Sequence, residues 1–371
     1  MTQRLTVKTQ RSASSYPILI DAESLSSIGE VAERLALGAK IAIITNKKVY
    51  GLYGSSVTNA LSKAGLKPIT HLIGDGERFK SLKTLESTLK FLGENKISRT
   101  DLVIALGGGV VGDLAGFAAS VYLRGIKFIQ VPTTLLSMID SSVGGKTGVN
   151  TDFGKNLIGA FYQPSAVLID PGVLQTLPKR ELTAGFCEAI KQGAIGGRKL
   201  LDLTQQAIDQ RLDSGQFDRF LAEQVRFKAS IVAADERESA AKTDAKSRKI
   251  LNFGHTFGHA IEKVTRYRKF KHGEAVGHGV IFAAELSKKL ELLGSDDVIL
   301  LNDVVHRAGS LPSLHGIDPS EIFEAFKFDK KNMGRSLQWI LLTGIGKPVI
   351  KSGAEVPDKA LKDTLRTLIS R

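Results

Sequence analysis

The sequence predicts an α/β domain with a Rossmann-like parallel sheet, followed by a mainly α-helical domain. In the first half, short apolar runs alternate with amphipathic helical patterns, which is typical of βαβ units. After about Pro178 the apolar runs nearly stop, while helical periodicity continues. For a chain of 371 residues we therefore expect two domains, residues 1–175 and residues 176–371.

Each element is predicted from its own apolar pattern. Strands are expected at residues 41–45, 69–73, 102–106, 127–131 and 166–170, with helices near 49–63, 81–92 and 110–122. Alternation between residues 4 and 20 predicts a flanking hairpin. In the second half, helices are expected at residues 179–195, 216–234, 250–265, 273–290 and 295–307, and one late strand at 337–342.

The composition argues against several classes of protein. The formal net charge of +13 favours anionic partners, but the basic residues are scattered and lack the aromatic interleaving of a nucleic-acid binder. The apolar stretch 102–123 contains Asp113 and five glycines, so it does not indicate a membrane span. The N-terminus has no apolar core typical of a signal peptide. Because Cys187 is the only cysteine, no internal disulfide forms, and we expect a cytoplasmic protein without nucleic-acid or membrane partners.

A glycine-rich motif follows the predicted strand at 102–106. Residues 107–112 fit the G-x-G-x-x-G pattern, in which backbone N–H groups approach a pyrophosphate at a helix N-terminus. The usual acidic residue about 20 positions further on is absent, since Thr133 stands there. The motif alone fits either a dinucleotide site or a plain tight turn, and Asp113 either a cofactor contact or a helix cap.

The segment Gly145-Lys146-Thr147 resembles the end of a P-loop, but Asp140 occupies the position where that loop needs glycine. We therefore exclude a P-loop. Lys146 is either a point charge for a phosphate or an ordinary exposed lysine.

Three histidines form a candidate metal centre. His255 and His259 lie four residues apart on a predicted helix and share one face, and His272 begins the next helix. Two histidines and a carboxylate with one open position make a catalytic zinc site. Glu188 is a candidate carboxylate, although spacing alone does not select it, and the alternative is a set of core or capping histidines.

Taken together, many segments in the same order resemble the 3-dehydroquinate synthase family, over nearly the whole chain. The matching segments are residues 75–82, 106–117, 124–150, 154–164, 185–191, 235–238, 248–262, 271–276 and 345–347. The resemblance implies an NAD-binding α/β domain, a helical metal-binding domain and a homodimer.

The resemblance also implies three groups of site residues. Zinc, or cobalt in its place, is expected on Glu188, His255 and His272, whereas His259 would face the substrate phosphate. The residues expected to hold NAD are Asn46, Glu77, Lys80, Gly108, Gly109, Asp113, Thr133, Thr134, Lys155 and Thr176. The residues expected to contact the substrate are Asp140, Lys146, Asn156, Lys191, Lys228, Glu238, Arg248, Asn252, His259 and Lys347, with Arg124 of the partner subunit.

One segment departs from the family pattern. Nine residues, 239–247, separate Glu238 from Arg248, where the family more often has about three. The assignment of Arg248 depends on its distance to Asn252, and Asp244 is an alternative to Glu238 for the acidic position.

The family's substrate is an acidic sugar phosphate, 3-deoxy-D-arabino-heptulosonate 7-phosphate, which becomes 3-dehydroquinate and phosphate. The resemblance implies transient oxidation by NAD, phosphate elimination, re-reduction and aldol closure, with Lys228 and Arg248 on the substrate carboxylate. Alternatives are another sugar phosphate cyclase, a metal-dependent polyol or glycerol-phosphate dehydrogenase, and a nucleic-acid-binding protein.

Overall fold

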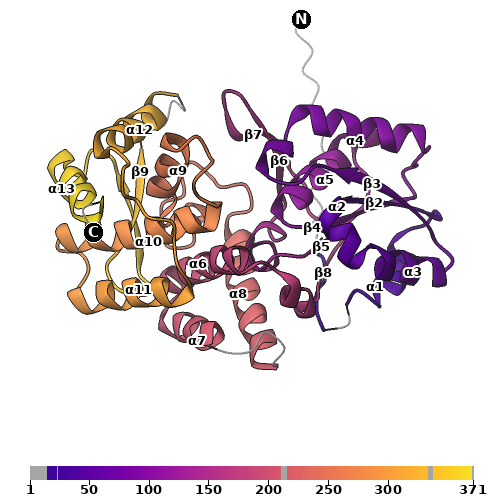
Figure 1. Cartoon of the computed structure of the whole chain (residues 1–371), viewed down its shortest axis with the longest axis horizontal. Helices are drawn as coiled ribbons and strands as arrows, with labels where there is room; N and C mark the ends of the chain where they lie inside the picture. The colour runs from indigo at the N-terminus through magenta and orange to yellow at the C-terminus, as the bar shows by residue number, and fades with distance from the viewer. Residues whose placement is uncertain (1–14, 23, 210–214, 333–336, 370–371) are drawn as a thin grey trace, which may run out of the picture.

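The computed structural model describes residues 15–22, 24–209, 215–332 and 337–369. A sheet with its flanking helices forms one side of the molecule, and a mainly helical part forms the other (Figure 1). The predicted fold class is confirmed. The sheet ends with β8 (Ala166–Ile169), and the first long helix of the second part is α6 (Lys179–Gly196). The division after residue 175 stays a prediction.

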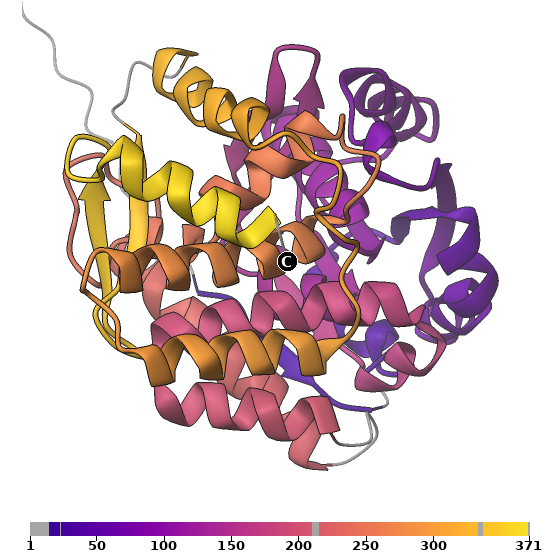
Figure 2. The same ribbon diagram turned by 60° about the vertical axis from the view of Figure 1, so that its left-hand side comes forward.

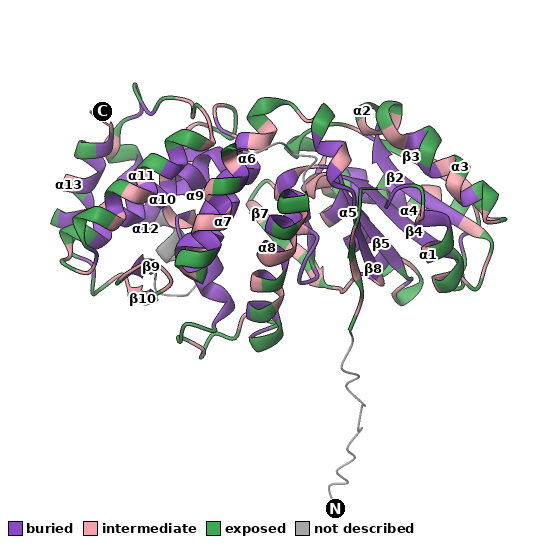
Figure 3. Ribbon diagram, turned by 90° about the horizontal axis from the view of Figure 1, so that it is seen from below, coloured by how far each residue is buried: buried purple, intermediate pink, exposed green. Residues whose placement is uncertain are grey.

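The sheet has six parallel strands in the order β1-β8-β5-β4-β2-β3. The further strands are β1 (Ile18–Ile20), β2 (Lys40–Asn46), β3 (Lys67–Ile73), β4 (Leu102–Gly107) and β5 (Phe128–Pro132). All five predicted strands are present, and no end is displaced by more than two residues. The central strands are buried (Figure 3), because helices cover the sheet, and this explains their continuous apolar runs.

The N-terminal hairpin prediction is wrong for Ile18–Ile20, which pair in parallel with β8. Residues 4–14 of that prediction lie outside the described residues. An alternating pattern is shared by hairpin strands and by edge strands, so it did not distinguish them.

The helical elements described in this part include α1 (Ile28–Leu35), α2 (Lys47–Val49), the π-helical turn η1 (Tyr50–Gly54), α3 (Ser55–Lys63), α4 (Leu82–Glu94) and α5 (Gly109–Val121). The three predicted helices correspond to η1 with α3, to α4 and to α5. The antiparallel hairpin of β6 (Lys146–Thr151) and β7 (Gly154–Phe161) was not predicted. It rises between the two parts of the molecule (Figure 1).

The second part is a helical assembly with one small antiparallel sheet. Its elements after α6 are α7 (Arg198–Asp209), α8 (Gly215–Ala234), η6 (Arg248–Asn252), α9 (His255–Val264), α10 (His272–Lys289), α11 (Ser295–Ala308), α12 (Pro319–Asn332), β9 (Gln338–Leu342), β10 (Pro348–Ser352) and α13 (Asp358–Ile369). The predicted helices α6, α8, α9, α10 and α11 and the strand β9 are present. The predicted helix 250–265 starts later, because residues 248–252 form the 3₁₀ turn η6.

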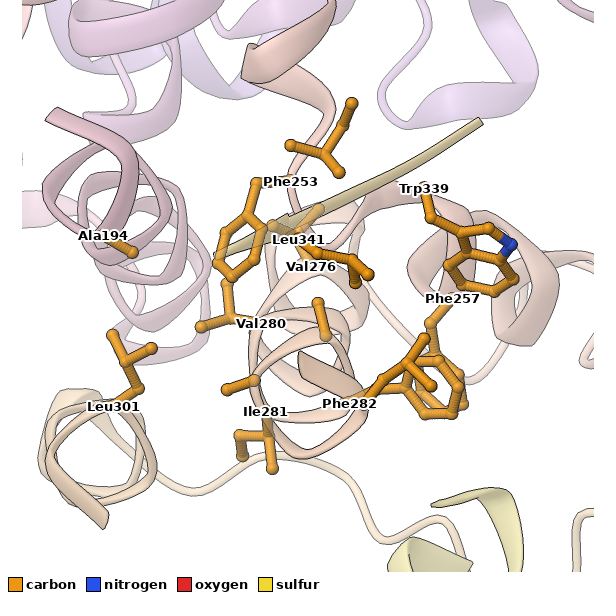
Figure 4. Close-up of a cluster of buried hydrophobic side chains, with 14 of the residues drawn as sticks. Ala194, Phe253, Phe257, Val276, Val280, Ile281, Phe282, Leu301, Trp339 and Leu341 are labelled. Atoms are coloured by element: carbon orange, nitrogen blue, oxygen red, sulfur yellow. The ribbon is translucent and has the colours of Figure 1, made fainter. Parts of the chain in front are cut away.

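Helix α10 runs through the centre of this part, with α6, α9, α11 and α13 packed around it (Figure 2). Its core is rich in aromatic rings, and Phe257 stacks on Phe282 at 4.6 Å between ring centroids (Figure 4). In the described part of the chain, no helix has the length and apolar character needed to cross a membrane.

Helix α6 is shared by the cores of both parts. Its residues are buried without interruption from Thr183 to Ile195. Phe186 packs into the core that contains the sheet, and Ile190 packs into the core around α10. Any side chain that α6 directs at the site is therefore held from two sides.

Candidate active site

The glycine loop and several predicted cofactor residues meet at the carboxyl edge of the sheet. The chain places β3 outside β2 and then returns to the other side of β2 to form β4, so the strand order reverses there. Ligands of open α/β sheets bind at such a point. The predicted cofactor residues at the ends of these strands are Asn46, the last residue of β2, Gly108 and Gly109 after β4, Thr133 and Thr134 after β5, and Thr176 after β8.

Close packing explains one of the loop glycines. A Cβ at Gly112 would lie 2.6 Å from Oε1 of Gln130 on β5, so glycine lets α5 approach the sheet. Gly108 is the N-cap of α5, with no capping side chain. Asp113 lies one turn further into the helix, which excludes the alternative that Asp113 caps it.

Asp113 instead pairs with Lys80. The Lys80 Nζ lies 2.5 Å from Oδ2 of Asp113 and donates to Oδ1 of Asn156 on the hairpin at 2.5 Å. Burial raises the pKa of Asp113, although Lys80 opposes the shift. Nearby, Glu77 accepts a hydrogen bond from Asn150 at 2.7 Å. A predicted substrate residue, Asn156, therefore contacts the predicted cofactor residue Lys80.

The three histidines and Glu188 form one cluster on α6, α9 and α10. Ring centroids lie 5.1 Å apart for His255 and His272, and 5.3 Å apart for His255 and His259. The Oε1 of Glu188 lies 3.5 Å from Nε2 of His272 and 3.9 Å from Nε2 of His255. One ligand atom from each of the three histidines lies within 4.8 Å of the others. The geometry thus brings together every predicted metal residue.

Hydrogen bonds orient two of these imidazoles toward Glu188. Nδ1 of His272 lies 3.3 Å from Oε2 of Glu262, and Nδ1 of His255 lies 3.3 Å from the Phe253 carbonyl oxygen. These contacts fit the tautomer with the proton on Nδ1, which leaves the Nε2 lone pair for a metal, an arrangement that recurs around metal ligands. Glu262 was missed at the sequence level, although its spacing from His259 and His255 on one helix face is visible there.

Glu188 itself is fully buried, and neither of its carboxylate oxygens has a hydrogen-bond partner among the described residues. Lys191 forms an ion pair with it, with Nζ 2.6 Å from Oε2, but not in hydrogen-bonding geometry. Burial and the Lys191 charge hold the pKa of His255 well below its usual range, so this ring is neutral. A buried carboxylate that faces the Nε2 atoms of two imidazoles fits a divalent zinc-type cation.

Asp140 connects this cluster to the sheet-containing part. It lies in the π-helical turn η4 (Ser137–Ser141), a type of distortion that is common at functional sites. Lys228 on α8 forms an ion pair with its carboxylate, and the Lys191 Nζ lies 4.0 Å from Oδ2. Burial alone would raise the pKa of Asp140, but Lys191 and Lys228 together hold it far below its ordinary value. Asp140 is therefore ionised.

A third group surrounds Arg248, which is 2% exposed. Its guanidinium donates to the Glu236 carbonyl oxygen at 2.6 Å and to the Gly144 carbonyl oxygen at 2.9 Å. Glu238 forms an ion pair with Lys146 at the start of β6. Asp244, the alternative acidic residue, is exposed and accepts from the Lys246 N–H at 2.8 Å. The geometry therefore favours Glu238 over Asp244 beside the site.

The remaining predicted site residues lie at separate places in the structure. Lys155, predicted to hold NAD, lies 3.2 Å from Oε1 of Glu262 and above the Tyr267 ring, on the metal side. Asn252 ends η6 and is half-buried. Lys347 is exposed in the turn between β9 and β10, and Arg124 is exposed in the turn η3 (Tyr122–Arg124) after α5.

Comparison with known proteins places this site in a class. Family models described as 3-dehydroquinate synthase N-terminal and C-terminal match residues 70–184 and 185–332. A 3-dehydroquinate synthase of Rippkaea orientalis is 42% identical over 356 residues, covering 95% of each chain. The structure of 2-epi-5-epi-valiolone synthase from Streptomyces hygroscopicus, with NAD+ and Zn2+ bound, is 28% identical with a TM-score of 0.89 and covers 99% of this chain and 100% of its own.

A structure of 2-deoxy-scyllo-inosose synthase complexed with carbaglucose-6-phosphate, NAD+ and Co2+ is 26% identical, with a TM-score of 0.81, and covers 94% of this chain and 96% of its own. The fold and the site thus define a sugar phosphate cyclase. Within that class, the chain belongs to the 3-dehydroquinate synthase family.

Proposed function

We propose that this chain converts 3-deoxy-D-arabino-heptulosonate 7-phosphate into 3-dehydroquinate and phosphate, with NAD and a divalent metal, zinc or cobalt, bound to it. Family membership and 42% identity to a 3-dehydroquinate synthase support the reaction. Related cyclase structures with NAD+ and Zn2+ or Co2+ support the cofactors. Since phosphate leaves by cleavage of a carbon–oxygen bond, the enzyme is a lyase.

The metal would be held by Glu188, His255 and His272, and when bound it supplies a Lewis acid that polarises the hydroxyl oxygen at carbon 5. The residues at the carboxyl edge of the sheet would hold NAD, which would supply a hydride acceptor that is restored within the same turnover. Glu262 and the Phe253 carbonyl oxygen keep the two imidazoles in the orientation that this role requires.

The residues around the hairpin suit the phosphate. Lys146 and Asn156 lie on β6 and β7, and His259 lies beside the metal cluster on α9. Their cationic and amide donors would offset the phosphate charge and orient the leaving group. Once carbon 5 is a ketone, the neighbouring proton is acidic, and the bound phosphate is itself a sufficient base. No dedicated protein base is required for the elimination.

The observation that carries the substrate assignment is the pair of buried cations Lys228 and Arg248. The buried or partly buried charged groups at the centre include three cations, Lys191, Lys228 and Arg248, and three carboxylates, Asp140, Glu188 and Glu262, so their charges balance. A bound metal adds further positive charge, so the centre needs an anion. The substrate carboxylate meets that need, whereas a neutral sugar phosphate has no group for this position.

The decisive experiment follows phosphate release and NADH absorbance together, with substrate in excess over NAD. Phosphate should accumulate well beyond the NAD supplied, without steady growth of free NADH. One NADH released per substrate consumed would instead establish a dehydrogenase.

The carboxylate assignment has its own test. Arg248→Ala should weaken binding of the carboxylated substrate by roughly 2–5 kcal/mol, because it leaves a desolvated charge without its partner. An analogue that lacks the carboxylate should be affected far less. Equal losses for both compounds would assign Arg248 another role.

A further inference from the structure

The loop between α8 and η6 contains the nine residues, 239–247, that separate Glu238 from Arg248. Asp235, 7% exposed, ties both ends of this segment together. Its Oδ1 accepts from the Ser239 N–H at 2.8 Å, and its Oδ2 accepts from the Arg248 N–H at 2.9 Å and the Ser247 hydroxyl at 3.3 Å. One carboxylate thus closes the loop at its base.

Lys249 fills the inside of the same loop. The residue is 6% exposed, and its ammonium donates to the Ala240 carbonyl oxygen at 2.7 Å and to the Lys242 carbonyl oxygen at 3.1 Å. Burying an ammonium group is costly unless hydrogen bonds replace its water, and here two loop carbonyls do so. The Lys242 ammonium attaches the loop to the end of α8 by donating to the Ala234 carbonyl oxygen at 2.8 Å.

Two candidate substrate residues directly adjoin these anchors. Glu238 precedes Ser239, has a φ of +52°, and pairs with Lys146. Arg248 lies between Ser247 and Lys249 and directs its guanidinium at the Gly144 carbonyl oxygen. A positive φ outside glycine persists only where neighbouring contacts hold it. The anchors therefore set the backbone at Glu238 and Arg248, the two predicted substrate residues that flank the loop.

We propose that Lys249, with Asp235, is a positioning residue that keeps the 239–247 loop folded before substrate binds, and so presents Glu238 and Arg248 in their working positions. The inference rests on the proposed function for the identity of the substrate. Without these contacts of Lys249 and Asp235, which we call the clamp, the loop would order only when substrate binds. The apparent affinity for substrate would then fall in proportion to the fraction of molecules with a folded loop.

The test compares Lys249→Met, which keeps the apolar stem and removes the ammonium, with Lys246→Met, which alters an exposed lysine of the same loop. Hydrogen exchange of substrate-free protein should show faster exchange at 239–247 in Lys249→Met only. If the folded fraction falls to about one tenth, KM for the substrate should rise about tenfold with kcat less affected. NAD and metal affinities should stay unchanged.

Unchanged exchange and KM in Lys249→Met, or equal effects in Lys246→Met, would overturn the proposal. Because exchange is measured without turnover, absence of phosphate release in the wild type would refute the proposed reaction and leave the clamp testable. If Lys249→Met does not fold, Asp235→Asn serves instead, since it keeps the side-chain shape and weakens the hydrogen bonds at the base of the loop. Faster hydrogen exchange at 239–247 is again expected. Exchange as slow as in the wild type would overturn the proposal.

Discussion

Glu188 is an ionisable side chain with no exposure to water, and in the described part of the chain no group forms a hydrogen bond to its oxygens. Such a group is expensive to bury unless cations surround it. Lys191 supplies one cation, and the predicted metal would supply the second. The cost of burial is therefore a reason to expect tight metal binding at this residue.

We predict one divalent metal per chain, held by Glu188, His255 and His272. Alanine at any of the three should lower the metal content and abolish activity, whereas His259→Ala should retain metal and lose rate, because His259 is the exposed member of the cluster. Metal analysis of purified variants decides between them. Loss of metal in His259→Ala with retention in His272→Ala would reverse the assignment.

We predict that Glu262 sets metal affinity without being a ligand. Burial is outweighed by the hydrogen bond from His272 and the charge of Lys155, which hold the pKa of Glu262 at about 2. Glu262→Gln should weaken metal binding by about 10- to 100-fold, measured by chelator competition. Lys155→Met removes the other partner of Glu262 and should have a smaller effect. An affinity in Glu262→Gln equal to that of the wild type would exclude the role.

At the scale of elements, α9 and α10 meet backbone to backbone. A Cβ at Gly279 would lie 1.9 Å from the Gly254 carbonyl oxygen, and Gly254 directly precedes His255. A side chain there must separate the two helices that carry His255 and His272.

Gly279→Ala should therefore destabilise the metal-free protein by about 1–3 kcal/mol and weaken metal binding. Gly93→Ala on α4 is the matched control, because a Cβ there meets nothing within 4 Å. Thermal unfolding and chelator competition measure both effects. Identical behaviour of the two variants would mean that the helices can separate freely.

The elements that were predictable from the sequence are those with a strong local pattern. The buried parallel strands stand out as apolar runs, and α6, α8 and α10 as long periodic segments. The β6–β7 hairpin was missed because half-buried and exposed residues dominate β7, so its sequence contains no apolar run that would predict a strand.

The candidate site was only partly predictable. Histidine spacing indicated a metal centre, but the resemblance was needed to select Glu188. The contacts of Lys80 with Asn156 and of Lys155 with Glu262 join segments 76 and 107 residues apart. Local sequence patterns contain no signal for such pairs.

At the scale of the whole molecule, we predict a homodimer in which Arg124 serves the partner's site. Arg124 is exposed, and the adjacent Val121 and Leu123 are 44% and 41% exposed, as expected for apolar residues covered by association. Mixing inactive Arg124→Ala with inactive Glu188→Ala under conditions of subunit exchange should restore activity, to about one quarter of the wild type for random pairing. No recovery, with exchange verified, would place Arg124 in its own chain's site.

The sharing of α6 between two cores has a consequence for cooperativity. Phe186 packs with the core of the sheet, Ile190 with the core of α10, and one helix cannot unfold on one side alone. The predicted cofactor and metal residues are divided between the two parts, but we expect the two parts to unfold together in one transition. Fluorescence of Trp339, the only tryptophan, reports on the second core, and far-ultraviolet circular dichroism reports on both. The two denaturation curves should coincide, and a fragment of residues 1–175 should expose apolar surface and aggregate rather than persist as an autonomous domain.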